Sequence, residues 1–300
     1  MNEILRKSGG LFLAIICLLL LGVYLGPGST VAAAAAEMKL CSNCGMMLKK
    51  WAHTNHKFIN SEGDFRICSI HCLADMSKKS GEEPQKVLVA DYLQPNKMFP
   101  VEKAVYVIGS SAPGTMTMVS KLAFRSQGEA KKLAAEKGGK IAAFPDAFAA
   151  ATKELPKSKV NIEKKRIKMG KIVVPAAQDR CASCNMKPER YPRNSAQLIT
   201  PEKKRFHFCS TKCLFGFLDT PQEYGAGVVK VAAVWVHDYA SGRYIYGPNG
   251  YYVVGAKVLG PMGPEAIPFD LKTQAKAFVR ENGGTVLRFN EVKSANIGAK

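Results

Sequence analysis

The chain has 300 residues, of which 47% are hydrophobic and 22% are charged. This length allows about two domains of ordinary size, and the composition excludes a disulfide-held mini-protein, a disordered chain and a polytopic membrane protein. The 43 Lys and Arg residues outnumber the 24 Asp and Glu residues and give a net charge of +19, which favours an anionic partner.

The first residues predict an export signal. Arg6 and Lys7 precede an almost wholly apolar run at 11–25, and small residues follow as far as Ala36. This order is typical of a signal peptide or an N-terminal membrane anchor over residues 1–36. It predicts a protein that is periplasmic, or anchored in the membrane and facing the periplasm. There, an anionic membrane surface is a candidate partner, whereas nucleic acid is not expected.

The rest of the chain contains a duplicated sequence. The run CSNC at 41–44 recurs as CASC at 181–184, and the run CSIHC at 68–72 recurs as CSTKC at 209–213. Because the later matches keep the same order, two tandem units are expected. The predicted domains are unit 1 at 37–148, a basic linker at 149–177, unit 2 at 178–292 and a C-terminal tail at 293–300. The linker acts either as a solvated connector or as a docking patch for an anionic partner.

Each unit shows the pattern ββαβ twice, which predicts an α+β fold of two subdomains per unit. In the first unit, one helix is expected over 71–79 with Ser69 as its N-cap, and another begins after Ser126 and ends at Gly138. The equivalent last helix of the second unit is expected to start at Asp270 or Thr273. The predicted strands of the first unit lie at 58–60, 65–67, 87–91, 105–109, 116–119 and 141–144.

Eight cysteines form two sets of C-x2-C followed by C-x3-C. Close pairs of cysteines on a turn and at a helix start are typical of tetrahedral sulfur sites, here as treble-clef-like knuckles. The helix N-terminus favours thiolates, which are the form that binds metal. Disulfides and dithiol redox chemistry are alternatives in an exported protein, and His71 and His207 are alternative ligands. The candidate metal ligands are Cys41, Cys44, Cys68 and Cys72, and Cys181, Cys184, Cys209 and Cys213.

Four methionines recur at equivalent positions. Met46 and Met186 each lie two residues after the second cysteine of the turn, and Met116 and Met262 follow a glycine in the second half of each unit. Thioether and thiolate ligands together select Cu(I), whereas Zn²⁺ has little use for a thioether. We therefore add these four methionines to the candidate ligands and expect Cu(I), with zinc as the alternative.

The sequence predicts no enzyme. Neither C-x2-C turn is followed by the histidine that covalent haem attachment requires, and no Ser/His/Asp set or pair of carboxylates can be singled out. Asp91 and Asp238 stand at the ends of predicted strands, where a structural role is expected.

Several motifs together resemble the NosL family of nitrous oxide reductase accessory proteins. They are the Cys-Gly-Met at 44–46, the Tyr-Val-Ile-Gly at 106–109, the glycine-x-Met at Met116 and Met262, and the Gly-Gly before a final Phe. The resemblance implies a tandem copper(I) carrier in which Cys44 acts with Met116 and Cys184 acts with Met262. The other cysteines are additional to the minimal carrier and are similar to heavy-metal knuckles.

We therefore predict an exported copper(I)-binding carrier, or metallochaperone. It would deliver copper to nitrous oxide reductase or to another periplasmic metalloenzyme, so its expected partner is an acceptor metalloenzyme or a metal-trafficking protein. A structural-zinc interaction module is the first alternative, and a dithiol redox protein is the second.

Overall fold

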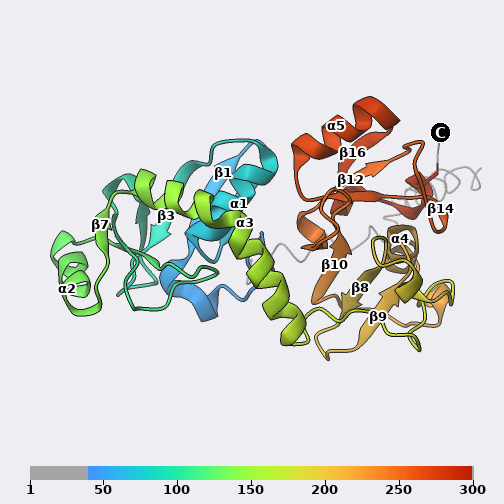
Figure 1. The fold of residues 1–300 in the computed structure, drawn as a ribbon, viewed down its shortest axis with the longest axis horizontal. Coiled ribbons are helices and arrows are strands. Elements are labelled where there is room, and N and C mark those ends of the chain that lie inside the picture. Colours follow the sequence, from blue (N-terminus) through green and yellow to red (C-terminus); the bar gives the residue numbers. More distant parts are fainter. Residues whose placement is uncertain (1–39, 299–300) are drawn as a thin grey trace, which may run out of the picture. The chain divides into compact units, whose positions relative to one another are not determined.

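A computed structural model describes residues 40–298 (Figure 1). The export signal predicted at 1–36 lies outside the described residues. Among residues 40–298, no helix combines the length and the apolar character that a bilayer crossing requires.

The first repeat begins with an antiparallel sheet of strand order β2-β1-β3-β4. The predicted N-cap is confirmed, because Ser69 Oγ accepts a hydrogen bond from the Cys72 N–H at the start of helix α1. Gly81, with a left-handed φ of 76°, ends this helix. The elements are the 3-10 helix Lys49–Thr54, β1 (His56–Asn60), β2 (Gly63–Ile67), α1 (Ile70–Ser80), β3 (Gln85–Ala90) and β4 (Met98–Pro100).

The second subdomain of this repeat is a three-stranded sheet of order β6-β5-β7 with one helix. Ser126 caps helix α2 as predicted, since its Oγ accepts a hydrogen bond from the Glu129 N–H. The strand predicted at 116–119 is wrong, because Met116 has a left-handed φ of 62° and the strand begins only at Lys121. The elements are the 3-10 helix Val101–Lys103, β5 (Val105–Ile108), β6 (Lys121–Phe124), α2 (Gln127–Lys137) and β7 (Lys140–Ala142).

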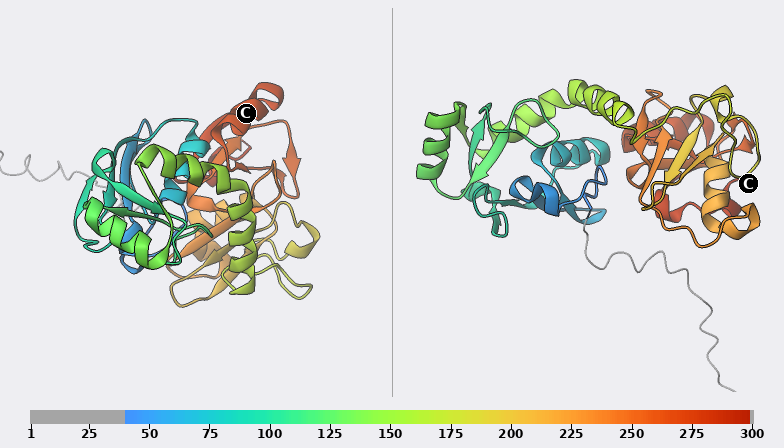
Figure 2. Two further views of the ribbon diagram at one scale, coloured as in Figure 1. Left: turned by 60° about the vertical axis from the view of Figure 1, so that its left-hand side comes forward. Right: turned by 90° about the horizontal axis from the view of Figure 1, so that it is seen from below.

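Helix α3 (Phe144–Lys168) follows the first repeat and leads toward the second (Figure 2). The basic segment predicted as a linker is helical as far as Lys168, and residues 169–177 carry neither helix nor strand. Ala147, Ala151 and Leu155 are buried in the first core. The N-terminal half of α3 therefore belongs to the packing of the first repeat.

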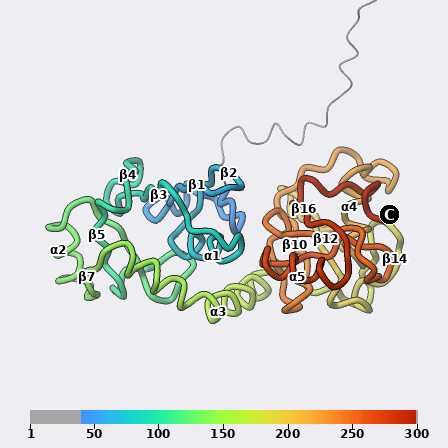
Figure 3. The backbone as a smooth tube through the Cα atoms, turned by 90° about the horizontal axis from the view of Figure 1, so that it is seen from above, coloured from blue at the N-terminus to red at the C-terminus, as the bar shows by residue number. Residues whose placement is uncertain are grey.

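Figure 3 shows the second repeat beyond helix α3, coloured from yellow to red. It has the same topology as the first repeat. Its sheets have the orders β11-β10-β8-β9 and β15-β12-β16, which match those of the first repeat strand for strand. The α+β prediction of ββαβ twice per repeat is thus confirmed. The elements are β8 (Ala196–Ile199), β9 (Arg205–Phe208), α4 (Thr211–Asp219), β10 (Ala233–His237), β11 (Tyr244–Tyr246), β12 (Tyr251–Val254), β15 (Ile267–Phe269), α5 (Lys272–Asn282) and β16 (Thr285–Arg288).

Short elements complete the second repeat. Strands β13 (Leu259–Gly260) and β14 (Gly263–Pro264) form a small hairpin that carries Met262 at its turn. Helix α5 starts between the two predicted positions, with Leu271 as its N-cap. The 3-10 helices are Pro188–Arg190, Pro221–Tyr224, Gly247–Asn249, Phe289–Glu291 and Ser294–Asn296.

A buried network of four charges, which we call the charge network, connects α1, α3 and the second repeat. Lys79 Nζ lies 3.2 Å from Asp75 and 3.1 Å from Asp270, and Lys159 pairs with the same two carboxylates. Burial alone raises the pKa of Asp75, but Lys79 and Lys159 lower it well below its usual range. The two carboxylates balance the two ammonium groups, so the network is stable only as a complete set.

At the start of strand β1, His56 is a buried neutral base. Its Nδ1–H donates to the Thr54 carbonyl at 2.9 Å, and Nε2 lies 3.1 Å from the Tyr106 hydroxyl, which donates to it. Burial lowers the pKa of His56 from 6.5 to about 4. Because the unfolded chain takes up this proton at a higher pH than the folded chain does, acidification stabilises the unfolded state.

We predict that His56 makes the protein less stable as the pH falls from about 6.5 toward 4. At pH 5 the loss relative to pH 8 is about 2 kcal/mol, from the difference between the folded and unfolded pKa values. Urea unfolding of the metal-free reduced protein measures it. His56→Gln should be destabilised overall but should lose this part of the pH dependence, and His53→Gln, at a half-buried histidine, is the control. Equal pH slopes in His56→Gln and the parent chain would contradict the assignment.

Candidate metal centre

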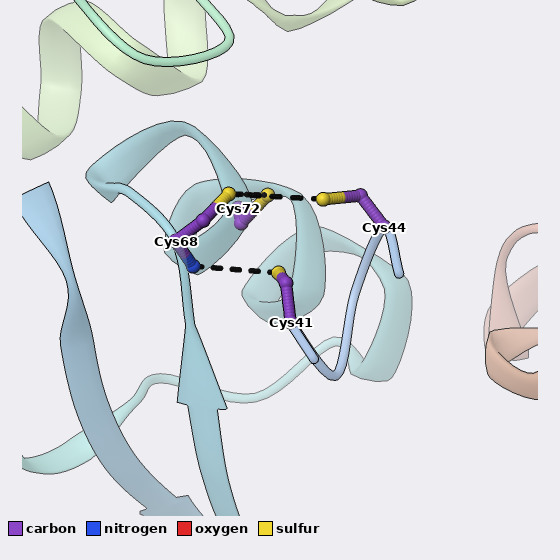
Figure 4. A group of neighbouring side chains, drawn as sticks. All are labelled: Cys41, Cys44, Cys68 and Cys72. Atoms are coloured by element: carbon purple, nitrogen blue, oxygen red, sulfur yellow. Dashed lines mark hydrogen bonds between the residues drawn. The ribbon is translucent and has the colours of Figure 1, made fainter. Parts of the chain in front are cut away.

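Four cysteine sulfurs meet in the first repeat, and we call this set the first centre. Cys41 and Cys44 lie on the turn before β1, Cys68 follows β2, and Cys72 lies in the first turn of α1. Their side chains point toward one another (Figure 4). All four Sγ atoms lie within 4.8 Å of one another, and Cys68 Sγ is 3.7 Å from that of Cys44 and 3.5 Å from that of Cys72.

The sequence of the C-x2-C turn explains its shape. The Cys41 N–H donates to the Met46 carbonyl at 2.7 Å, and the Gly45 N–H donates to the Cys41 carbonyl at 2.9 Å. Gly45 has a left-handed φ of 71°, which costs a glycine nothing. In the second repeat Asn185 takes this position with a φ of 61°, as a residue type that tolerates the conformation.

The second repeat holds the equivalent set of Cys181, Cys184, Cys209 and Cys213, which we call the second centre. Cys209 Sγ lies 3.4 Å from Cys184 Sγ and 3.7 Å from Cys213 Sγ. Ser210 caps α4 in the same way that Ser69 caps α1, because its Oγ accepts from the Cys213 N–H. Cys184 is half-buried, whereas the other seven of these cysteines are buried.

Each centre favours one thiolate among its four sulfurs. Burial raises the pKa of Cys41, but hydrogen bonds from Cys44, Cys68 and Cys72 lower it well below the usual thiol value. Hydrogen bonds to Cys41 correspondingly raise the pKa of Cys68 and Cys72. In the second centre, hydrogen bonds from Cys209 and Cys213 lower the pKa of Cys181 in the same way. In both centres, a metal cation can therefore replace the protons of the remaining thiols.

The sulfur spacing fits a metal ion. A tetrahedral ion with metal–sulfur bonds of about 2.3 Å separates its sulfurs by about 3.8 Å. The closest sulfur pairs lie at 3.4 to 3.7 Å, and the eight cysteines are free thiols. Either centre could close around one thiophilic ion after small side-chain movements.

The candidate methionines pack against the same cores as the sulfurs. Met46 and Met116 contact the core of the first centre, and Met186 and Met262 contact that of the second. Thr54 Oγ1 lies 2.7 Å from both the Cys68 carbonyl and Thr115 Oγ1, which holds the loop of Met116 beside the first centre. The sequence analysis did not identify this pair of threonines, because they lie 61 positions apart.

The second repeat holds its methionine loop by different means. Lys212 Nζ donates to the Met262 carbonyl at 3.0 Å. Glu265 Oε2 accepts from the Lys212 N–H at 2.9 Å and from Thr211 Oγ1 at 2.7 Å, and burial raises the pKa of this carboxyl. The start of α4 and the Met262 hairpin are thereby connected.

A cavity of about 60 Å³ lies beside the first centre, lined by Cys44, His71, Met116 and members of the charge network. His71 Nδ1 is buried without a hydrogen-bond partner among the described residues, and so is His207 Nδ1 in the second repeat. Neither histidine belongs to a sulfur cluster. The structure thus places Cys44 and Met116 on one cavity and leaves the two histidines outside the four-sulfur sets.

Comparisons with known proteins agree with the duplication. The family model described as NosL matches residues 32–151 and again residues 173–297. The copper-binding lipoprotein NosL of Stutzerimonas stutzeri is 32% identical over 126 residues, which cover 39% of this chain and 63% of the relative. The protein of the same name from Achromobacter cycloclastes is 25% identical, with coverages of 38% and 63%. The chain therefore spans less than two thirds of the length of these curated relatives.

Two solved structures are also similar. The crystal structure of the copper chaperone NosL from Shewanella denitrificans is 29% identical, covers 41% of this chain and 96% of its own, and has a TM-score of 0.37. The solution structure of apo-NosL from Achromobacter cycloclastes is 25% identical, with coverages of 34% and 87% and a TM-score of 0.28.

We predict that each centre binds one thiophilic ion independently of the other. Cys68→Ser and Cys209→Ser each remove the sulfur that contacts two others, so each should abolish one of two bound equivalents and leave the second. Titration of the reduced protein with Cd²⁺, followed by thiolate-to-metal absorbance, counts the sites. Loss of both equivalents, or of neither, in a single variant would contradict two separate centres.

Proposed function

The chain belongs to the NosL family, and from this membership and its two sulfur centres we propose that it is an exported copper(I) carrier. In this role it delivers copper to nitrous oxide reductase or to another periplasmic metalloenzyme. The main support for the proposal is that, in each repeat, four thiols lie together and two thioethers pack against the same hydrophobic core. This mixture of sulfur ligands favours Cu(I) over harder ions.

The carrier works by ligand exchange, without a change in oxidation state. A sulfur of the acceptor binds Cu(I) as one of the carrier's own sulfurs leaves, so the ion is never released to water. The proposed ligands of the first centre are Cys41, Cys44, Met46, Cys68, Cys72 and Met116, from which the ion uses a subset at each step. Those of the second centre are Cys181, Cys184, Met186, Cys209, Cys213 and Met262.

We propose that the protein works on the periplasmic side of a membrane. Relatives named as lipoproteins support anchoring. Helix α3 adds a basic surface, because Glu154 and Glu163 are bound by neighbouring groups. An anionic membrane surface suits the exposed lysines of this helix, which are Lys153, Lys157, Lys164, Lys165 and Lys168.

We propose that the two units span residues 37–148 and 178–292 and are joined by the basic segment 149–177. When parts of the chain are expressed, this segment should accompany the first unit, because helix α3 packs on the first core and carries Lys159 of the charge network.

A structural-zinc module is the second candidate, because a closed set of four thiols suits Zn²⁺ as well. The two candidates differ in what metal removal does. A structural zinc site contributes about 10 kcal/mol or more to folding, so its loss unfolds the surrounding repeat. A carrier must remain folded when it is empty.

We predict that the reduced, chelated protein keeps its secondary structure. Each repeat has one apolar core without any cysteine, around Phe124 in the first and Phe269 in the second, and these cores need no metal. Metal analysis of the exported protein should find copper, and circular dichroism of the chelated protein should show cooperative thermal unfolding. Cooperative unfolding that is lost on chelation and restored by Zn²⁺ but not by Cu(I) would favour the zinc module. Metal-free protein with disulfides in place of thiols would instead favour dithiol redox chemistry.

The methionines test the choice of ion. The double variant Met116→Leu, Met262→Leu should weaken Cu(I) binding at least about tenfold, because a thioether ligand is lost from each centre. It should unfold at nearly the same urea concentration, since volume-conserving swaps cost under about 1.5 kcal/mol. Competition with a chromophoric Cu(I) chelator measures affinity, and Met76→Leu, at a buried methionine of α1, is the matched control. Unchanged Cu(I) affinity would return both methionines to a packing role.

A further inference from the structure

The side chain of Asn43 anchors the C-x2-C turn of the first centre to helix α1 and to Asn249 of the second repeat. Its side chain is buried, with the residue 4% exposed. Asn43 Nδ2 donates to Asp75 Oδ2 at 2.9 Å, and Asn43 Oδ1 accepts from Lys79 Nζ at 3.0 Å and from Asn249 Nδ2 at 2.7 Å. Three buried hydrogen bonds therefore hold the residue next to Cys44.

Two of these partners belong to the charge network. Asp75 and Lys79 are held in turn by Lys159 and Asp270. If the turn lifted away, the amide contacts would break and two buried charged groups would lose a hydrogen bond. Opening the first turn is costly for this reason.

The outer face of the same turn is also covered. Arg166 Nη2 donates to the Cys44 carbonyl at 3.4 Å. The ring of Tyr246 lies so close to Gly45 that a Cβ there would sit 3.0 Å from it. Cys44 itself is only 7% exposed, so this cover restricts the approach of an incoming sulfur ligand to the cavity that Cys44 lines.

The second repeat lacks the amide and the two charged groups of this anchor. By position in the repeat, Ser183 replaces Asn43, Gly216 replaces Asp75 and Thr220 replaces Lys79. Ser183 Oγ makes one hydrogen bond, donated to the Cys213 carbonyl at 2.8 Å. Asn185, at the position of Gly45, is exposed, and Cys184 is half-buried. The second turn can open at lower cost, and its Cys184 is already less buried than Cys44.

We propose that the two centres exchange metal at different rates: the second centre passes copper through Cys184, and the first centre, held shut by Asn43, retains it. The proposal rests on the carrier function. The local free energy of opening decides how often a buried ligand set is accessible. One chain thus contains a centre that retains Cu(I) and a centre that exchanges it, and Asn43 is the positioning residue that causes the difference.

Stopped-flow transfer of Cu(I) from the fully loaded full-length chain to a chromophoric chelator tests this. Release should occur in two phases of similar amplitude whose rates differ about tenfold or more. Cys184→Ser should remove the fast phase, and Cys44→Ser should remove the slow one. A single phase carrying both equivalents, or the opposite assignment, overturns the proposal but leaves the carrier function standing. A chain that binds no copper overturns both.

The anchor itself is tested by exchanging residues between the repeats. Asn43→Ser gives the first turn the residue of the second and should speed the slow phase about fivefold or more. Ser183→Asn is the matched control and should not convert the fast phase into a slow one, because Gly216 and Thr220 provide no partners for the amide. Hydrogen exchange of the loaded parent chain adds a readout that needs no variant: the Cys41 and Gly45 amides should exchange more slowly than those of Cys181 and Asn185. Equal exchange at the two turns, or an unchanged slow phase in a folded Asn43→Ser protein, overturns the role of Asn43.

Discussion

In each repeat the rest of the metal centre depends on a capped helix N-terminus that meets the end of a β-hairpin. Ser69 and Ser210 bind the N–H groups of Cys72 and Cys213, and so fix the first helical turn. The helix dipole favours negative charge there. Two sulfurs meet at this place, and the C-x2-C turn brings two more across the hairpin, of which Cys41 or Cys181 is the favoured thiolate.

Local signals made much of this predictable from the sequence. The serine caps at 69 and 126 and the cysteine spacings each involve residues a few positions apart. The duplication then allowed every assignment in one repeat to be checked against the other. The α+β topology followed from the order of these local elements, and the four-sulfur sets followed from the spacing.

The remaining features depend on tertiary contacts that no local pattern reports. Met116 lies in a left-handed conformation where its sequence resembles a strand, because the threonine pair at 54 and 115 holds its loop. Helix α3 continues through Pro156, since its apolar side packs on the first core. The charge network brings Asp75 together with a residue 195 positions later, and a pairing at that distance has no sequence signature.

The charge network also makes the two repeats depend on each other. In the first repeat, Asp75 and Lys79 find half of their ion-pair partners in Lys159 and Asp270, which lie beyond residue 148. In the second, the described hydrogen bonds that hold the C-x2-C turn and the Met262 loop come from its own residues. Asp270 of the second repeat, however, has both of its ion-pair partners, Lys79 and Lys159, outside that repeat. A chain with the order of the two repeats reversed would have the same composition and the same two folds, but it would lose the connection through α3 that holds Asp75 and Lys79 in place.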